Sequence, residues 1–235
     1  MIDIHNHLLY GIDDGSLSLE DSIDVLKDLE KCGYTDIILT PHYITCSRYT
    51  SSKKDNLKLL EKLKKEVKKN KIDINLYLGN EIFMDDDIVE LLKRGIISSL
   101  NDTKYLLIEL PMNGEYPNYQ EVFSFILSKG YKVILAHPER YLSFQEDFDL
   151  IYELKDMGLY FQCNLESIIG RYGSHAKKVI TRMLKENMVS YLATDIHHKK
   201  SDYSTLSDAK KEILKYINEE EFDKLTKENP KKLLS

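Results

Sequence analysis

The stretch Asp3-Ile4-His5-Asn6-His7 opens the chain, and its pattern predicts a short buried strand that ends in two histidines. Side chains at positions i and i+2 of a strand point to the same side of the sheet. His5 and His7 can therefore bind one metal ion together. Two histidines in a polar core would give the same pattern, so the interpretation depends on what the rest of the chain adds.

The composition is that of a globular α/β protein. The chain has 235 residues, 42% of them hydrophobic, and a formal net charge of -6. This length suits one larger α/β domain over residues 1–235. We find no run of 18 apolar residues that could span a membrane and no secretory signal, so a cytoplasmic location is expected. The acidic balance disfavours nucleic acid as a partner.

The cysteines do not indicate a site. Cys32, Cys46 and Cys163 lie far apart and form no C-x-x-C pattern, so neither a disulfide framework nor a zinc ribbon is predicted. Cys46 precedes Arg48 but lacks the glycine-rich C-x5-R spacing of a cysteine-dependent phosphatase loop. We therefore expect free thiols and no cysteine nucleophile.

Strand-like and helical runs alternate along the chain. Strands are predicted within residues 1–9, 36–40, 74–78, 105–110, 132–136, 159–163 and 190–194. Helices are predicted within 18–33, 54–70, 85–94, 119–128, 146–157, 175–186, 205–218 and 220–227, with a frayed tail after Pro230. Strict alternation predicts parallel strands with right-handed crossovers. Because no G-x-G-x-x-G or Walker motif is present, a barrel is favoured over an open nucleotide-binding sheet.

Residues that can bind metal recur where the predicted strands end. They are His5, His7, His42, Glu81, Glu109, His137, Asp195 and His197. Active sites of parallel βα folds form at the carboxyl ends of the strands, so these residues should meet at one mouth. Glu109 stands among leucines and isoleucine, where an unpaired carboxylate would be costly to bury. The alternative is a hydrogen-bonded polar layer inside the barrel.

The mixture of imidazole and carboxylate groups favours Mn, Fe or Zn over a thiolate-selected metal or a calcium site. The number of candidate ligands predicts a cluster of two or three ions. Such a cluster can clamp a phosphoryl group and generate a hydroxide nucleophile at neutral pH.

Seven short motifs together carry a family resemblance. They are His5-Asn6-His7, Asp13-Asp14-Gly15, Thr40-Pro41-His42, Gly79-Asn80-Glu81, Ile108-Glu109, Ala136-His137-Pro138-Glu139-Arg140-Tyr141 and Thr194-Asp195-Ile196-His197. The set resembles the PHP (polymerase and histidinol phosphatase) superfamily. More narrowly, it is similar to the bacterial CpsB/YwqE-type protein tyrosine phosphatases that regulate capsule and exopolysaccharide synthesis. The resemblance covers essentially the whole chain.

This resemblance implies a distorted (β/α)7 barrel with a trinuclear site that usually contains manganese (Mn2+). By the same resemblance, the first ion would be held by His5, His7, Glu81 and Asp195. Glu81 would bridge to a second ion, held also by Glu109 and His137. The third ion would be held by Asp14, His42 and His197. Many other PHP proteins have a histidine in place of Asp14, and the aspartate matches the tyrosine phosphatase branch.

Arg140 is the predicted catalytic residue. It follows His137 by three positions, and a planar guanidinium can bind two phosphate oxygens and stabilise charge during transfer. The alternative is a surface arginine on a loop. The similar phosphatases commonly carry a second arginine beyond the last metal histidine, where this chain has Lys199 and Lys200; either could substitute as a point charge. Asp3 is expected either to orient one of the histidines or to be a plain core carboxylate.

The expected function is hydrolysis of phosphotyrosine on a protein by metal-activated hydroxide, and the resemblance suggests a bacterial tyrosine autokinase as the partner. Two alternatives stay open: a small-molecule phosphomonoesterase of the histidinol phosphatase type, and a non-catalytic metal-binding scaffold. The loops at residues 43–52 and 112–118 are expected to border the mouth. Nothing in the sequence specifies an oligomeric state.

Overall fold

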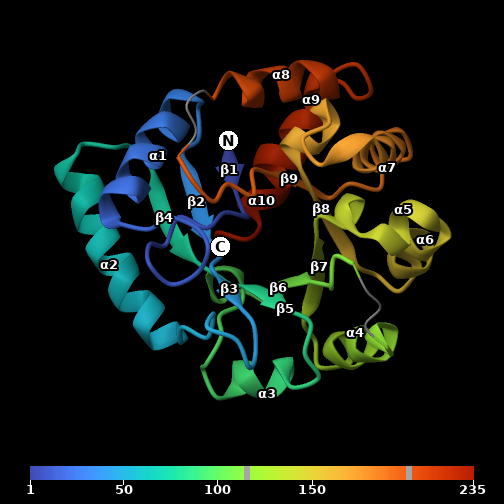
Figure 1. Cartoon of the computed structure of the whole chain (residues 1–235), viewed down its shortest axis with the longest axis horizontal. Coiled ribbons are helices and arrows are strands. Elements are labelled where there is room, and N and C mark those ends of the chain that lie inside the picture. Colours follow the sequence, from blue (N-terminus) through green and yellow to red (C-terminus); the bar gives the residue numbers. More distant parts are fainter. Residues whose placement is uncertain (114–116, 200–202) are drawn as a thin grey trace.

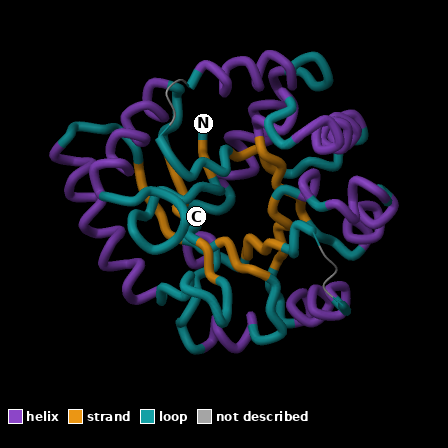
Figure 2. The backbone as a smooth tube through the Cα atoms, viewed as in Figure 1, coloured by secondary structure: helices purple, strands orange, loops and turns teal. Residues whose placement is uncertain are grey.

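The protein was analysed as a computed structural model that describes residues 1–113, 117–199 and 203–235. Strands lie at the centre and helices surround them (Figures 1 and 2). The strands are β1 (Ile2–Asp3), β2 (Asp36–Leu39), β3 (His42–Tyr43), β4 (Asn75–Leu78), β5 (Glu81–Phe83), β6 (Tyr105–Glu109), β7 (Lys132–Ala136), β8 (Tyr160–Asn164) and β9 (Tyr191–Ala193).

Most of the α-helices cover the outside of these strands (Figure 1). The α-helices are α1 (Leu19–Lys31), α2 (Lys53–Lys69), α3 (Ile88–Lys93), α4 (Tyr119–Ser128), α5 (Leu142–Glu146), α6 (Asp149–Asp156), α7 (Gly173–Lys185), α8 (Ser204–Ile213), α9 (Glu219–Asp223) and α10 (Asn229–Lys231). The described residues also include three 3-10 helices, η1 (Leu100–Asp102), η2 (Pro138–Arg140) and η3 (Leu165–Ile169), and one π-helix, η4 (Lys224–Glu228).

All the paired strands are parallel. One sheet has the order β1-β2-β4, and the other has the order β3-β5-β6-β7-β8-β9. A parallel bridge between Asn6 and Ile196 joins the segment after β1 to the segment after β9. Next to it, His7 N donates to Ile196 O at 2.9 Å and Asp195 N donates to His5 O at 2.8 Å. The predicted α/β fold of parallel strands inside a layer of helices is confirmed.

The strand ladder is interrupted twice, between β2 and β3 and between β4 and β5, and the sequence did not predict these breaks. Pro41 cannot donate a backbone hydrogen bond. Two buried asparagines serve the backbone there: Asn6 Nδ2 donates to Ile38 O at 3.0 Å, and Asn80 Nδ2 donates to Pro41 O at 2.9 Å. Asn80 Oδ1 also accepts from Ser98 N at 2.8 Å. The breaks direct the side chains of His42 and Glu81 toward the middle of the fold.

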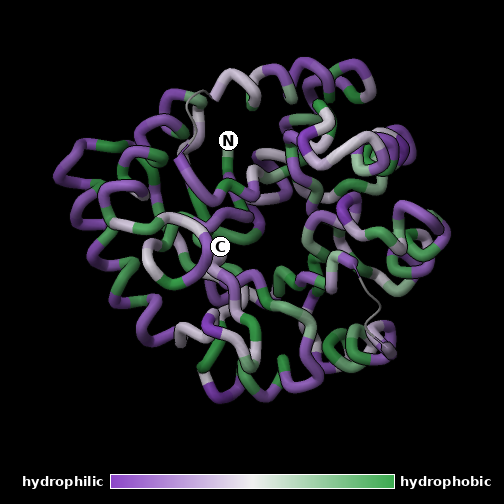
Figure 3. The backbone as a smooth tube through the Cα atoms, in the orientation of Figure 1, coloured by the Kyte–Doolittle hydropathy of each residue, from purple (hydrophilic) through white to green (hydrophobic). Residues whose placement is uncertain are grey.

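Amphipathic helices cover the strands as their periodicity predicts. In α2, Leu60, Leu63 and Val67 are buried, while most of its lysines are exposed. Figure 3 shows hydrophilic residues recurring along these outer helices. A capping box begins α1: Ser18 Oγ accepts from Asp21 N, and the Asp21 carboxylate accepts from Ser18 N. No helix within the described ranges is long and apolar enough to cross a membrane.

The helix predicted at 146–157 is α6, which begins later, at Asp149, because Asp147 is extended (φ -130°, ψ 100°) and its Oδ1 accepts from Asp149 N at 3.0 Å. The short helix α5 that precedes it was not predicted. The prediction of a frayed tail after Pro230 is wrong. Leu233 is fully buried in an apolar cluster with residues of β1, β2, β6, β7 and β9, and Asn101 Nδ2 donates to Leu233 O at 3.2 Å. The C-terminal segment therefore packs against the strands.

Candidate metal centre

The structure brings all nine predicted metal ligands together at the carboxyl ends of the strands. His5 and His7 follow β1, His42 follows β2 and begins β3, Glu81 follows β4 and begins β5, and Glu109 ends β6. His137 follows β7, Asp195 and His197 follow β9, and Asp14 comes from the loop before α1. They form four overlapping groups, in each of which the ligand atoms lie within 4.8 Å of one another: His7, Asp14, His42 and His197; His5, His7 and Glu81; His5, His137 and Asp195; and His42, Glu81 and Glu109.

The hydrogen bonds of His5 and His7 indicate that both present a lone pair to the same point. His5 Nδ1 is 2.7 Å from Gln162 Oε1, and His7 Nδ1 is 2.8 Å from Asp13 Oδ2. Because these oxygens accept, each Nδ1 carries a hydrogen, and each ring in its neutral, metal-binding form has an unprotonated Nε2. The two Nε2 atoms are only 3.4 Å apart. A divalent ion bound by both atoms would resolve this contact, which two facing lone pairs alone would not favour.

Glu81 is the central carboxylate of this arrangement. Its Oε1 lies 3.2 Å from His5 Nε2 and 2.9 Å from His137 Nε2, and its Oε2 lies 3.3 Å from His7 Nε2 and 3.0 Å from His42 Nδ1. Glu81 is 1% exposed. Glu81 Oε2 and His42 Nδ1 face each other in the interior, and neither forms a well-aligned hydrogen bond with any of the described residues. Buried polar atoms need a partner, and a metal ion would supply one to both.

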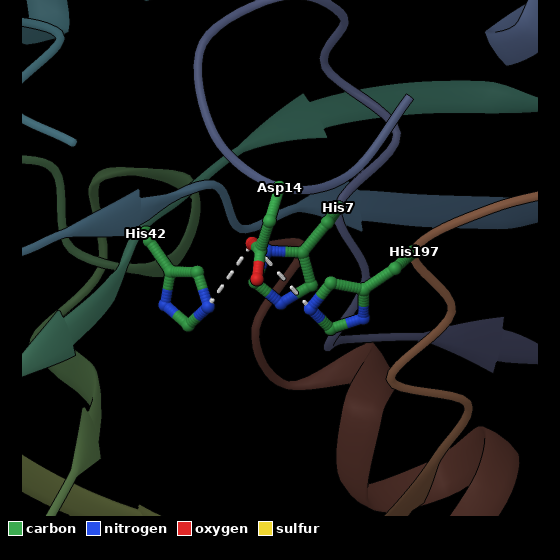
Figure 4. A group of neighbouring side chains, drawn as sticks. All are labelled: His7, Asp14, His42 and His197. Carbon is green, nitrogen blue, oxygen red and sulfur yellow. Dashed lines mark ion pairs between the residues drawn. The ribbon is translucent and has the colours of Figure 1, made fainter. Parts of the chain in front are cut away.

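Asp14 closes the outer side of the centre. Figure 4 shows its carboxylate between His42 and His197, with His7 behind it. Asp14 Oδ1 is 3.5 Å from His42 Nε2 and 3.7 Å from His197 Nε2. The Asp14 side chain is 48% exposed, unlike that of Glu81. This group is therefore the part of the centre that an incoming ligand can reach.

Burial and the neighbouring carboxylates shift the pKa values of the residues in the centre. Burial opposes protonation of His5, but the Glu81 and Asp195 carboxylates outweigh it and raise the pKa of His5 to about 9. Burial raises the pKa of the Glu109 carboxyl group, and the neighbouring Glu81 carboxylate raises it further. Three acidic side chains thus lie where positive charge is strongly favoured. Nitrogen and oxygen donors in this mixture fit a divalent metal such as Mn, Fe or Zn.

Comparisons with known proteins agree with this geometry. Residues 1–235 match the family described as capsular polysaccharide synthesis, CpsB/CapC. The chain belongs to the CpsB/CapC family. CapC of Staphylococcus aureus is 38% identical over 199 residues, which cover 84% of this chain and 77% of CapC. The tyrosine-protein phosphatase YwqE of Bacillus subtilis is 33% identical over 202 residues, covering 86% and 79% of the two chains.

Solved structures give the same relationship. A crystal structure from a study of Bacillus subtilis YwqE and Streptococcus pneumoniae CpsB, described as unique metal-dependent tyrosine phosphatases, matches with a TM-score of 0.91 at 30% identity. The match covers 100% of this chain and 94% of that one. A phosphotriesterase homology protein of Escherichia coli, complexed with phosphate, matches with a TM-score of 0.68 at 14% identity and shares the fold alone.

Arg140 lies beside the metal centre of this CpsB/CapC family member and not on an exposed loop. Its NH1 donates to Asp195 Oδ2 at 2.7 Å, and its side chain is 25% exposed. Burial opposes its charge, but Asp195 together with Tyr172 and the acidic groups nearby outweighs burial and raises the pKa of Arg140. One N–H group is used by Asp195, and a guanidinium has five. Arg140 can therefore bind a second anion while it stays fixed to the centre.

Two of the grouped residues have a strained backbone. His137 has φ +33° and Asp195 has φ +51°, the left-handed region that non-glycine residues rarely adopt. Each stands just beyond the end of its strand, β7 or β9. The turn at these positions directs both side chains into the centre. Strain of this kind is characteristic of functional sites, where the surrounding structure holds it in place.

The orienting carboxylate is Asp13 and not Asp3. Asp13 Oδ2 binds His7 Nδ1 and also accepts from His42 N at 3.0 Å, so it connects two ligand segments. Asp3 instead accepts from Thr194 N at 3.0 Å and Thr194 Oγ1 at 2.7 Å, and from Asn6 Nδ2 at 3.3 Å. The fully buried Asp3 therefore ties the first strand to the last, which matches the alternative of a core carboxylate.

Sequence reasoning missed the contribution of β8, which supplies none of the nine predicted ligands. Gln162 Oε1 binds His5 Nδ1, and Gln162 Nε2 donates to Asn164 Oδ1 at 2.9 Å. Asn164 Nδ2 then donates to Asp195 Oδ2 at 2.7 Å. Both residues are fully buried. Two amides at positions i and i+2 of an otherwise apolar strand were the available signal.

Gln162→Leu is expected to lower metal affinity by about 10–100-fold, because residues that orient a ligand from behind typically have effects of this size. The leucine would leave His5 Nδ1 without an acceptor and free the imidazole to turn. Competition with a chelating dye measures the affinity. Gln120→Leu on α4, where the amide bonds to Glu153, is the matched control and should change nothing. Equal affinities for both variants would contradict the role assigned to Gln162.

Of the two candidate substitutes for a second arginine, Lys199 does not lie at the centre. Lys199 is exposed, and its Nζ donates to Asp24 Oδ2 on α1 at 2.7 Å. Lys200 lies outside the described residues. His175 and His198, which were not predicted as ligands, are both exposed.

Proposed function

We propose that this chain is a metal-dependent protein tyrosine phosphatase. The observation that carries the proposal is the cage of nine histidine and carboxylate ligands with Arg140 at its edge, in a chain whose relatives are named tyrosine-protein phosphatases. The chemistry proposed is hydrolysis of a phosphotyrosine ester on a protein. Residues 1–235 would act as one phosphatase domain.

The proposed ligand sets follow the motif positions. One ion would be held by His5, His7, Glu81 and Asp195. Glu81 would be shared with a second ion, held also by Glu109 and His137, and Asp14, His42 and His197 would hold a third. We propose Mn2+ as the metal, in two or three ions, because the donor set mixes imidazole with carboxylate oxygens. Bound divalent ions would activate water and polarise the phosphoryl oxygens.

The side chains of this protein contribute positioning and charge. Asp195 fixes the Arg140 guanidinium at 2.7 Å, so that its remaining N–H groups can bind the phosphoryl oxygens as negative charge develops. Gln162 and Asp13 hold the hydrogens of His5 and His7 on Nδ1. A tyrosine leaving group has a pKa near 10 and is easier to expel than an alkoxide, so little acid assistance is needed.

The biological setting is a further part of the proposal. The family is described by capsular polysaccharide synthesis, which supports a phosphotyrosine protein of that process as the substrate. We propose a bacterial tyrosine autokinase as this protein and the cytoplasm as the place of action.

Substrate comparison tests the proposal. Manganese-loaded protein is expected to hydrolyse a phosphotyrosine peptide with a kcat/KM well above that for histidinol phosphate and for the matching phosphoserine peptide. A higher kcat/KM for histidinol phosphate would support a small-molecule phosphomonoesterase instead. No hydrolysis of any of the three with Mn, Fe, Zn or Mg, in protein that remains folded, would support a binding scaffold.

A further inference from the structure

Recognition of the substrate's aromatic ring is not explained by the metal centre. The nine ligands and Arg140 can contact the phosphoryl group, which phosphotyrosine shares with every phosphomonoester. A preference for phosphotyrosine therefore needs residues that contact the ring. The inference below rests on the proposed function and concerns these residues.

Two partly buried tyrosines lie against residues of the centre. Tyr49, in the loop after β3, stacks on His42 with ring centroids 5.9 Å apart and an interplanar angle of 17°. Tyr172, just before α7, lies under Arg140, whose guanidinium carbon is 4.4 Å from the ring centroid. Arg140 binds Asp195, whereas His42 lies next to Glu81 and Asp14. The two tyrosines thus reach the centre from different loops and next to different ligands.

Each tyrosine ring is braced by an arginine that precedes it in the sequence. Arg48 NH2 donates to Tyr49 Oη at 2.8 Å, and its guanidinium carbon is 4.9 Å from the ring centroid. Arg171 has its guanidinium carbon 5.9 Å from the Tyr172 ring centroid and donates to Glu166 Oε2 at 2.7 Å. Rings held in this way lose little freedom when a ligand stacks on them.

The sequence repeats this arrangement. The chain has five arginines, and three are followed by tyrosine, in Arg48-Tyr49, Arg140-Tyr141 and Arg171-Tyr172. Tyr141 is 1% exposed and serves the backbone: it donates to Ala136 O at 2.8 Å and accepts from Leu110 N at 2.9 Å. Of the three, Tyr49 and Tyr172 are the partly exposed ones.

The chemistry of Tyr172 limits what it can do. Burial raises the pKa of Tyr172 to about 12, so the phenol stays neutral and is no nucleophile at physiological pH. What a neutral half-buried tyrosine offers is its ring, and aromatic rings prefer stacked or edge-to-face contact with another ring.

We propose that Tyr49 and Tyr172 form two aromatic walls of the mouth, which contact the phenyl ring of a phosphotyrosyl substrate while its phosphoryl group reaches the metal ligands and Arg140. They are specificity-determining residues for aryl phosphates. A phosphoserine or small alkyl phosphate places no ring between them and gains nothing from the walls.

Two non-hydrolysable ligands test the walls by binding alone. Benzylphosphonate carries a ring and methylphosphonate does not, while both present the same phosphonate group. In calorimetry with manganese-loaded protein, Tyr49→Ala and Tyr172→Ala are each expected to weaken benzylphosphonate by about tenfold and methylphosphonate by less than about twofold. Tyr49→Phe and Tyr172→Phe keep the ring and should bind benzylphosphonate as the unchanged protein does.

A matched control is Tyr216→Ala. Tyr216 is also half-buried and carries a cation near its ring, Lys185 at 5.4 Å, but it lies beyond α8. The Tyr216→Ala variant should leave the affinity for both ligands unchanged. The proposal would be overturned if Tyr49→Ala and Tyr172→Ala weakened the binding of both phosphonates equally. It would also be overturned if they left the binding of both unchanged.

The binding readout also separates this inference from the proposed function. Because phosphonates are not hydrolysed, a benzylphosphonate preference that depends on both tyrosines would support the walls even if no phosphopeptide were hydrolysed. If the protein hydrolysed phosphotyrosine but showed no such preference, the proposed phosphatase function would stand and the proposed role of Tyr49 and Tyr172 would be refuted.

Discussion

Replacing Glu81 by glutamine is expected to lower phosphatase activity by about 10³-fold or more, because loss of the shared carboxylate removes several kcal/mol of metal-derived stabilisation. Glu81 lies within 3.3 Å of four histidine nitrogens, on His5, His7, His42 and His137. Glutamine keeps the shape but supplies only one oxygen and no charge. Metal content after dialysis, measured by mass spectrometry, should fall together with activity on a phosphotyrosine peptide.

The control for this variant is Glu90→Gln, an exposed glutamate on α3 that should keep full activity. A Glu81→Gln protein that kept both its metal and its activity would show that this carboxylate does not share ions. A variant that kept its metal but lost activity would instead place Glu81 among the groups that act on the substrate.

Replacing Gly15 by alanine is expected to displace His7 and destabilise the protein. An added Cβ would lie 1.9 Å from His7 O and 2.5 Å from His7 Cβ, and the first of these is a backbone atom. Ser16 N donates to the same carbonyl at 2.9 Å, so the loop cannot move away freely. Overpacking of this kind costs about 2–3 kcal/mol, which corresponds to a fall in Tm of roughly 5–10 °C. Metal affinity should fall as well.

Gly158→Ala separates the two effects of the Gly15 variant. Gly158 has φ +95° and open space around its Cβ position, so alanine there would strain the backbone without touching the centre. Thermal unfolding should show a loss of stability in both variants, and chelator competition should show weaker metal binding only in Gly15→Ala. Unchanged metal affinity in Gly15→Ala would contradict the role of this glycine in placing His7.

The position of the site was predictable because the order of elements determines it. In a parallel βα fold, each strand presents its carboxyl end to the same side, so a histidine or carboxylate after each strand is enough to place a common site. His137 and Asp195 illustrate this, since they come from β7 and β9 and lie in one group with His5. The candidate ligands at strand ends could be named without knowledge of contacts, whereas Asp14, in the loop before α1, came from the family resemblance alone.

The supporting residues could not be predicted in the same way. Gln162 and Asn164 are not metal ligand types, and only the structure shows that they connect His5 to Asp195. The sequence offered Asp3 as a support for the histidines, whereas the loop conformation at Gly15 places Asp13 in that position, because Gly15 N donates to Asp13 Oδ1 at 2.9 Å. Such contacts depend on loop geometry, which periodicity does not encode.

The strand breaks and the C-terminus show a related limit. Side chains of Asn6 and Asn80 replace ladder hydrogen bonds between β2 and β3 and between β4 and β5. The burial of Leu233 depends on residues of five strands that are distant in sequence. Local propensity at these positions gives a loop or a frayed end, and tertiary packing overrides it.

The most direct test of the central claim is hydrolysis of a phosphotyrosine peptide by metal-stripped protein, followed by titration with Mn, Fe, Zn or Mg and with Arg140→Ala measured in parallel. The account predicts no activity without metal and recovery on addition of Mn2+. It also predicts a rate in Arg140→Ala that is lower by about 10²–10³-fold. Full hydrolysis by the metal-free protein, or no recovery with any of the four metals, would contradict it.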